Sequence, residues 1–242
     1  MVELPLKLSH TEVASLIVNS GRLDIRDVDG GEKPFLYSSG NYGPGYLDIK
    51  GACGQDEVFE TFTEQSALRL LEEDAKFDFV AGNATGGMIP AFRVKQLLAE
   101  WTSRHIPYVY LRNTRKLGGQ EEYATGIDNN PEVTKDMSPL IYEELVNFAQ
   151  TTSNAAEVWR DILGFKAPTY AGTIVEYATT AAKENLDRLG LTLVSVIDLP
   201  TILNVAEELK LFDVGAINSY RDFLRDPGQW QTTRGLQKKE LS

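Results

Sequence analysis

PLIYEELVNFAQTTSNAAEVWR, residues 139–160, is the stretch of the chain that decides its fold. It begins with a short apolar run, residues 139–142, of the length and character of a buried strand. Glu143 and Glu144 follow, then a polar segment, and from Thr151 onward apolar residues recur with the spacing of an amphipathic helix. The stretch therefore predicts one βα unit with two acids between its strand and its loop.

This unit has a layout that suits phosphate and sugar binding. The unpaired N–H groups at the start of a helix bind phosphate, and acids beside them can hold a ribose hydroxyl or a metal. An ordinary βα unit whose strand ends in two solvated acids has the same pattern, because such motifs specify function only loosely. The stretch by itself leaves both interpretations open.

The composition excludes several classes of function. The chain of 242 residues has 35 acids against 24 lysines and arginines, a net charge of −11, which argues against a nucleic-acid or anionic-membrane partner. Its single cysteine, Cys53, excludes an intrachain disulfide and a cysteine-built metal site. The two histidines, His10 and His105, are too few for a multi-histidine zinc site.

The chain shows no sign of secretion or of membrane insertion. Its N-terminal residues lack the apolar core of a signal peptide, and no apolar run approaches the ~20 residues of a membrane-spanning helix. We therefore expect a cytoplasmic protein without a membrane partner.

Strand and helix patterns alternate along the middle of the chain. Strands are expected at residues 77–81, 108–111, 139–142, 173–176 and 193–197, with helices at residues 56–73, 89–102, 181–189 and from Thr151. Such alternation predicts an α/β fold with a mainly parallel central sheet flanked by helices. The last ~45 residues have helical spacing.

Three loops at expected strand ends have unusual composition, and ligands bind at these ends in open α/β sheets. Residues 81–87, AGNATGG, are small enough for backbone N–H groups to approach an anion. Residues 112–119, RNTRKLGG, carry three cations within an otherwise acidic protein. The third is the acid pair with its following loop. Tight packing or a solvated loop would explain each one separately, but together they fit a phosphorylated sugar.

These segments also match, in order and spacing, those of one enzyme family. They are YSSG and YLD at residues 37–40 and 46–48, residues 82–90, 112–119 and 140–160, and the strand, helix and strand at residues 173–176, 184–186 and 194–199. The chain resembles the orotate phosphoribosyltransferase family, with its type I phosphoribosyltransferase fold, over about residues 10–205. The resemblance implies a phosphoribosyltransferase-like domain over residues 1–205, with a small N-terminal hood from about residues 1–50. Residues 206–242 would form a helical C-terminal extension packed on it.

The resemblance also implies roles for individual residues. Two acids would engage the ribose hydroxyls of phosphoribosyl pyrophosphate, directly or through Mg²⁺, and a cationic loop would close over the neighbouring subunit's site in a homodimer. The implied catalytic residues are Arg112, Arg115 and Lys116, the phosphoribosyl-pyrophosphate-binding residues are Ala84, Thr85, Gly86, Gly87, Glu143, Glu144, Thr151 and Thr152, and the base-binding residues are Tyr46 and Tyr177.

The sequence departs from the family pattern at several of these places. Asn113 and Gly118 stand where a lysine and a histidine are usual, and Glu144 replaces an aspartate. Residues 147–150, Asn-Phe-Ala-Gln, replace the Thr-Thr-Gly-Gly that cradles a 5′-phosphate. A side chain at Ala149 or Gln150 is expected to obstruct the positive φ angles and the close approach that glycine permits. Tyr177 stands where an arginine faces the carboxylate of orotate.

Two hypotheses follow from this combination of retained and replaced residues. The first is an orotate phosphoribosyltransferase-like enzyme that moves a 5-phosphoribosyl group from phosphoribosyl pyrophosphate to a pyrimidine-type base, with Mg²⁺. The alternative is a non-catalytic relative that binds a nucleotide or a protein partner. The retained cations, glycines and acids favour the first hypothesis, and the altered cradle favours the second.

Overall fold

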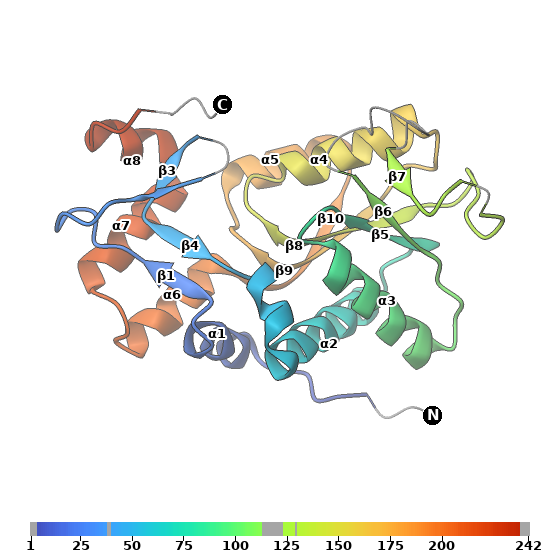
Figure 1. Ribbon diagram of the computed structural model, residues 1–242, viewed down its shortest axis with the longest axis horizontal. Helices are drawn as coiled ribbons and strands as arrows, with labels where there is room; N and C mark the ends of the chain where they lie inside the picture. The colour runs from blue at the N-terminus through green and yellow to red at the C-terminus, as the bar shows by residue number, and fades with distance from the viewer. Residues whose placement is uncertain (1–3, 38–39, 113–122, 129, 238–242) are drawn as a thin grey trace. The chain divides into compact units, whose positions relative to one another are not determined.

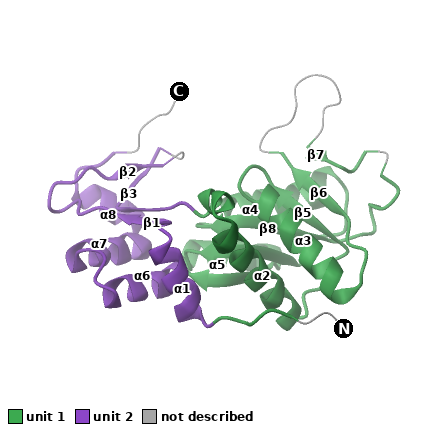
Figure 2. Cartoon of the chain, turned by 60° about the horizontal axis from the view of Figure 1, so that its bottom comes forward, with its two compact units in different colours: residues 1–8, 49–198 green, residues 9–48, 199–242 purple. Residues whose placement is uncertain are grey.

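The computed structural model describes residues 4–37, 40–112, 123–128 and 130–237 (Figure 1). The chain forms two compact units (Figure 2). The sheet unit comprises residues 1–8 and 49–198, and the helical unit comprises residues 9–48 and 199–242. The sequence expectation placed the first 205 residues in one domain with a hood from about residues 1–50, whereas residues 9–48 and 199–205 lie in the helical unit.

The sheet unit is built on a six-stranded sheet with the strand order β10-β9-β8-β5-β6-β7. All neighbouring strands are parallel except β6 and β7, which are antiparallel. This sheet confirms the predicted α/β class with a mainly parallel sheet. The strands are β5 (Phe79–Asn83), β6 (Tyr108–Leu111), β7 (Ala124–Thr125), β8 (Pro139–Val146), β9 (Tyr170–Glu176) and β10 (Thr192–Asp198).

Helices cover both faces of this sheet (Figure 1). On one face, α2 (Asp56–Glu72) and α3 (Met88–Thr102) pack on Val80, Leu140 and Tyr142. On the other face, α4 (Gln150–Glu157), its π-helical continuation η2 (Val158–Ile162) and α5 (Thr180–Leu189) pack on Phe79 and Ile141. A short 3₁₀ helix, η1 (Lys50–Gly54), precedes α2. Successive residues of β8 thus face opposite layers, because side chains alternate along a strand.

Both predicted strands that flank the site differ in their bounds from the expectation. The acids were expected to end the strand at Tyr142, but β8 continues through Val146, since Glu143 pairs with Thr173 and Val146 with Glu176 of β9. Strand β5 runs two residues further than expected, because Asn83 still pairs with Leu111 of β6. Pairing with neighbouring strands therefore overrides the polar and small residues that were read as loop.

The helical unit combines a segment from the first fifth of the chain, residues 9–48, with the segment that starts at residue 199. It contains α1 (His10–Asn19), β1 (Leu23–Ile25), β2 (Phe35–Leu36), β3 (Tyr42–Gly43), β4 (Gly45–Leu47), α6 (Leu199–Glu208), α7 (Val214–Arg225) and α8 (Pro227–Thr233). Strand β1 pairs with β4 and β2 with β3, both antiparallel. The Phe223 ring lies 5.5 Å from that of Trp230, whose Nε1 donates a hydrogen bond to Ser219. Gly45 passes close to the Tyr220 ring, which would lie 2.0 Å from any added Cβ.

None of the helices in the described part of the chain is both long and apolar enough to cross a membrane.

Candidate functional site

Residues 84–87, here called the glycine loop, connect β5 to α3 at the carboxyl end of the sheet. The Ala84 amide donates a hydrogen bond to the Leu111 carbonyl at 2.8 Å, and the Gly87 amide donates to the Asn83 carbonyl at 3.0 Å. The peptide bond between Ala84 and Thr85 is cis. Both ends of the loop are thus fixed to strands of the sheet.

The glycine loop lies directly against β8. A Cβ added to Gly86 would come within 1.9 Å of the Glu144 carboxyl group, and one added to Gly87 would lie 2.3 Å from the Tyr142 carbonyl oxygen. A side chain at position 86 would displace the flexible Glu144 carboxyl group, whereas one at position 87 would clash with rigid backbone, so glycine is required there. The structure brings the glycine loop and the acid pair together, as the sequence predicts.

Glu143 is buried on the face of the sheet that α4 covers. Its side chain is 8% exposed, and its Oε1 accepts hydrogen bonds from Asn83 Nδ2 at 2.8 Å and from Thr152 Oγ1 at 2.7 Å. Burial raises the pKa of the Glu143 carboxyl to about 7, although both hydrogen bonds act in the opposite direction. This acid thus changes its protonation state near neutral pH.

Glu144 points to the opposite face of the sheet, toward the glycine loop. Burial raises the pKa of its carboxyl group, and a hydrogen bond from its own backbone amide, together with the positive charge of Lys50, partly counteracts this effect. The two acids do not converge on one point inside the protein, because adjacent residues of a strand face opposite sides. In the described ranges, no three His, Cys, Asp or Glu side chains are grouped so that they could hold a metal ion.

The loop between β8 and α4 keeps a backbone conformation that a phosphate cradle needs. Ala149 has a φ of +55°, so the expectation that its side chain would obstruct a positive φ angle was wrong. Its methyl group is buried in the core, which offsets the cost of about 1 kcal/mol for a left-handed alanine. Thr179 and Asn185 hold the carbonyl groups of Asn147 and Phe148 at 3.0 and 2.9 Å.

This arrangement directs the carbonyl groups of the cradle toward α5 and leaves its amides free. Within the described structure, the N–H groups of residues 148–152 donate no hydrogen bond. Thr151 is exposed in the first turn of α4, whereas Thr152 is buried against Glu143. Free amides at the start of a helix form an anion-binding surface.

The remaining predicted site residues lie in different parts of the structure or outside its described residues. Arg112 follows β6, and its Nη1 donates a hydrogen bond to Thr125 Oγ1 at 3.2 Å. Arg115 and Lys116 lie outside the described residues. Tyr177 is 5% exposed, and its amide donates a hydrogen bond to the Val146 carbonyl, next to the cradle. Tyr46 belongs to the helical unit, where it is 41% exposed and its ring lies 5.7 Å from that of Phe35.

A small cavity adjoins the glycine loop and adds residues that the sequence analysis did not single out. Its volume is about 200 Å³. Lys50, which no sequence motif marked, is the positively charged residue of its lining. The cavity is lined by Ile49, Lys50, Cys53, Phe59, Thr85, Gly86, Ile89, Pro90, Glu144 and Ile174.

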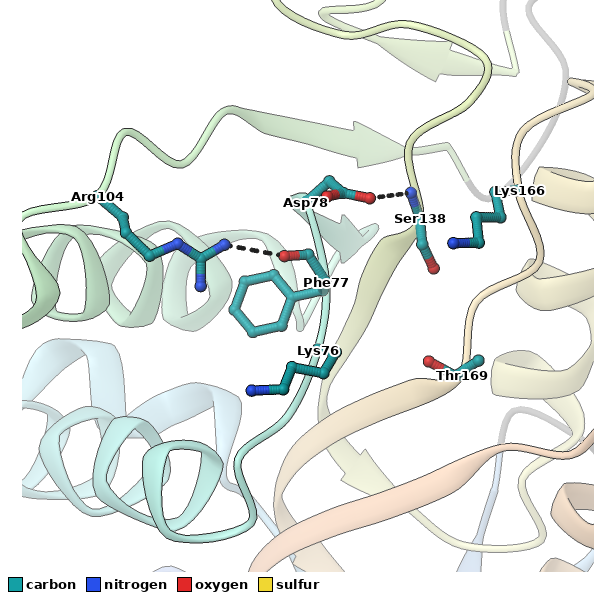
Figure 3. Close-up of a pocket in the computed structure, with 7 residues that line it drawn as sticks. All are labelled: Lys76, Phe77, Asp78, Arg104, Ser138, Lys166 and Thr169. Carbon is teal, nitrogen blue, oxygen red and sulfur yellow. Dashed lines mark hydrogen bonds between the residues drawn. The ribbon is translucent and has the colours of Figure 1, made fainter.

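A second cavity, of about 390 Å³, lies at the amino ends of β5, β8 and β9 (Figure 3). Two hydrogen bonds join residues that line this cavity: Arg104 donates to the Phe77 carbonyl, and Asp78 accepts from the Ser138 amide. None of the predicted site residues lines it. The carboxyl edge of the sheet is therefore the candidate functional site.

Comparison with known proteins gives a consistent picture, although the chain matches no family model. It is 26% identical over 205 residues to the orotate phosphoribosyltransferase of Bacteroides fragilis, covering 82% of this chain and 88% of that one. The predicted resemblance is thereby confirmed, at the level of a divergent relative.

Solved structures agree with this relationship. The orotate phosphoribosyltransferase of Aeropyrum pernix aligns with a TM-score of 0.61 and 25% identity, over 83% of this chain and 99% of that one. The Mycobacterium tuberculosis enzyme in complex with phosphoribosyl pyrophosphate has a TM-score of 0.56 and 19% identity, over 80% and 98%. UMP synthase of Leishmania donovani has a TM-score of 0.70 and 20% identity over 93% of this chain, which spans 43% of that protein. These likenesses confirm the type I phosphoribosyltransferase fold.

Proposed function

We propose that this chain, a divergent relative of the orotate phosphoribosyltransferases, moves a 5-phosphoribosyl group from phosphoribosyl pyrophosphate to orotate or a related pyrimidine base. The observation that carries this proposal is the meeting of the glycine loop, the acid pair and the free cradle amides at the carboxyl ends of β5 and β8. Two anion-binding loops separated by acids suit a sugar that carries phosphate at both ends.

Each part of the substrate has a corresponding part of the site. The glycine loop would receive the pyrophosphate group, and the amides of residues 148–152 would receive the 5′-phosphate. Glu143, which lies between the two loops, would accept hydrogen bonds from the ribose hydroxyls. The retained positive φ of Ala149 supports this assignment, because it leaves the cradle open despite the loss of both glycines.

The chemistry requires stabilisation of a highly charged leaving group. Breaking the anomeric C–O bond leaves an oxocarbenium-like sugar and pyrophosphate, so nearby positive charge lowers the barrier. Mg²⁺ usually binds through one or two carboxylates together with substrate phosphates. Because Glu143 and Glu144 face opposite sides of the sheet, one of these carboxyl groups together with the substrate phosphates would hold the ion. When bound, Mg²⁺ would neutralise charge on the pyrophosphate.

Further parts of the proposal rest on the family resemblance. Arg112, Arg115 and Lys116 would stabilise the departing pyrophosphate, with Lys116 acting in the site of a second copy of the chain. A homodimer and a cytoplasmic location belong to this proposal. Closure of the cationic loop would exclude water, which otherwise hydrolyses the activated sugar.

Base selection is one place where this chain departs from the family pattern. Tyr177 offers a neutral hydroxyl where an arginine is expected, and the preceding residue, Glu176, is an acid held by Ser195 Oγ at 2.5 Å. Burial raises the pKa of the Glu176 carboxyl group. We therefore infer that orotate binds more weakly here than to an arginine-bearing site, because a carboxylate gains most from a bidentate cation.

Calorimetric titration tests the proposal directly. Phosphoribosyl pyrophosphate with Mg²⁺ is titrated first, and orotate and uracil are then added with and without it, while pyrophosphate release reports turnover. Binding of the sugar phosphate with turnover of either base supports the transferase. Absence of sugar-phosphate binding in the folded protein would instead support the non-catalytic alternative.

A further inference from the structure

Asn83 links the glycine loop to the acid pair. It is the last residue of β5, it is 5% exposed, and its backbone carbonyl accepts the hydrogen bond from the Gly87 amide. Its side-chain Nδ2 donates to Glu143 Oε1 at 2.8 Å. One residue thus fixes both the closing amide of the loop and the first acid, although the sequence analysis gave it no role of its own.

Thr152 reaches the same acid from the opposite side. Its Oγ1, in the first turn of α4, donates a hydrogen bond to Glu143 Oε1 at 2.7 Å. The hydroxyl therefore points into the sheet and away from the cradle, where the resemblance had assigned it to the substrate. Both donors come from side chains that are at least 95% buried, so water does not compete for these bonds.

Both donors bind one oxygen of the carboxylate and leave the other available. Among the described residues, Glu143 Oε2 has no hydrogen-bond donor, yet it is not one of the fully buried polar atoms that lack a partner. Oε2 is therefore not fully buried. Two hydrogen bonds to Oε1 restrain the carboxylate and leave Oε2 as its available acceptor.

Glu144 lacks comparable support. In the described structure, no side chain donates a hydrogen bond to its carboxylate, which is stabilised by its own backbone amide and by the charge of Lys50. The two acids therefore differ in preorganisation: two side chains from other elements hold the first, whereas the second has only its own backbone amide and the packing against Gly86.

We propose that Asn83 and Thr152 are positioning residues that bind Oε1 of Glu143 and thereby present its Oε2 to the sugar hydroxyls of the substrate. This inference rests on the proposed function, since it names what holds the ribose-binding acid. In this proposal, Asn83 and Thr152 support recognition of the sugar hydroxyls, whereas the glycine loop and the amides of residues 148–152 recognise the phosphate groups.

The test compares ligands that contain the sugar with ligands that lack it. Affinities for ribose 5-phosphate, inorganic phosphate and pyrophosphate are measured by calorimetry on the full chain and on Thr152→Val, Thr152→Ser and Asn83→Leu. We expect Thr152→Val and Asn83→Leu to weaken ribose 5-phosphate about tenfold, because each removes a hydrogen bond to a charged group. Their affinities for phosphate and pyrophosphate should be unchanged, and Thr152→Ser should restore ribose 5-phosphate binding.

A matched control separates this role from general damage to the fold. Thr63 is also fully buried in the sheet unit, but its hydroxyl donates to carbonyl groups of its own helix, so Thr63→Val should leave all three affinities unchanged. Equal weakening of all three ligands in Thr152→Val, or no weakening of any, would overturn the inference. A wild-type chain that binds none of the three would overturn the proposed function itself, and this inference with it.

Discussion

Replacing Glu143 by glutamine is expected to change how the stability of the protein depends on pH. The folded-state pKa of Glu143 is about 7, against an ordinary value of 4.5. The folded protein therefore binds this proton more tightly than the unfolded chain does. Proton binding at Glu143 therefore contributes to the free energy of unfolding, and this contribution is fully present below pH 4.5 and is lost as the pH rises through 7.

The size of the effect follows from the two pKa values. At about 1.4 kcal/mol for each pH unit, the shift corresponds to a loss of ~3 kcal/mol in the free energy of unfolding between pH 4.5 and pH 8. Glutamine has nearly the same shape, and its Oε1 can accept the same hydrogen bonds from Asn83 and Thr152, but it does not titrate. Glu143→Gln should therefore be more stable than wild type at pH 8, by up to this amount, and close to it at pH 5.

Urea denaturation followed by circular dichroism at several pH values between 5 and 8 measures this difference. The control is Glu184→Gln, which removes an exposed carboxylate on α5 and should leave the pH dependence as in wild type. Parallel stability curves for wild type and Glu143→Gln would refute the reasoning, because they would show that burial does not raise this pKa. Sugar-phosphate binding by Glu143→Gln should fall even where stability rises, since the variant lacks a carboxylate.

Three further substitutions test other parts of the site. Gly87→Ala should abolish pyrophosphate binding and destabilise the fold by more than 1 kcal/mol, because its Cβ would meet the rigid Tyr142 carbonyl at 2.3 Å. Calorimetry measures the binding and urea denaturation measures the stability. The control is Gly54→Ala, whose added Cβ would have no atom within 4 Å. Ala149→Gly should change stability by less than about 1 kcal/mol, since relief of the positive φ offsets the lost methyl burial, and a loss of several kcal/mol would contradict this. Lys116→Ala should abolish turnover while circular dichroism shows an intact fold; unchanged turnover would remove Lys116 from the proposed mechanism.

Much of the fold was predictable because it depends on short-range patterns. The predicted helix at residues 181–189 corresponds to α5, and Gly190 ends it with a φ of +66°. The strand at residues 108–111 has the predicted bounds. Apolar periodicity and turn chemistry are properties of neighbouring residues, so they can be read from the sequence. The strand β7 was missed, because its two residues are defined by pairing with β6 and carry no pattern of their own.

The candidate site was predictable in its parts and not in its geometry. The sequence by itself located the glycine loop and the acid pair through their composition at expected strand ends, and it located the altered cradle through the order and spacing shared with the family that the chain resembles. Only the tertiary structure decided that Glu143 and Glu144 face opposite layers, that Asn83 and Thr152 hold the first acid, and that Ala149 takes a positive φ. These features depend on strand pairing and core packing between residues far apart in the chain. Local sequence patterns carry no information about such partners.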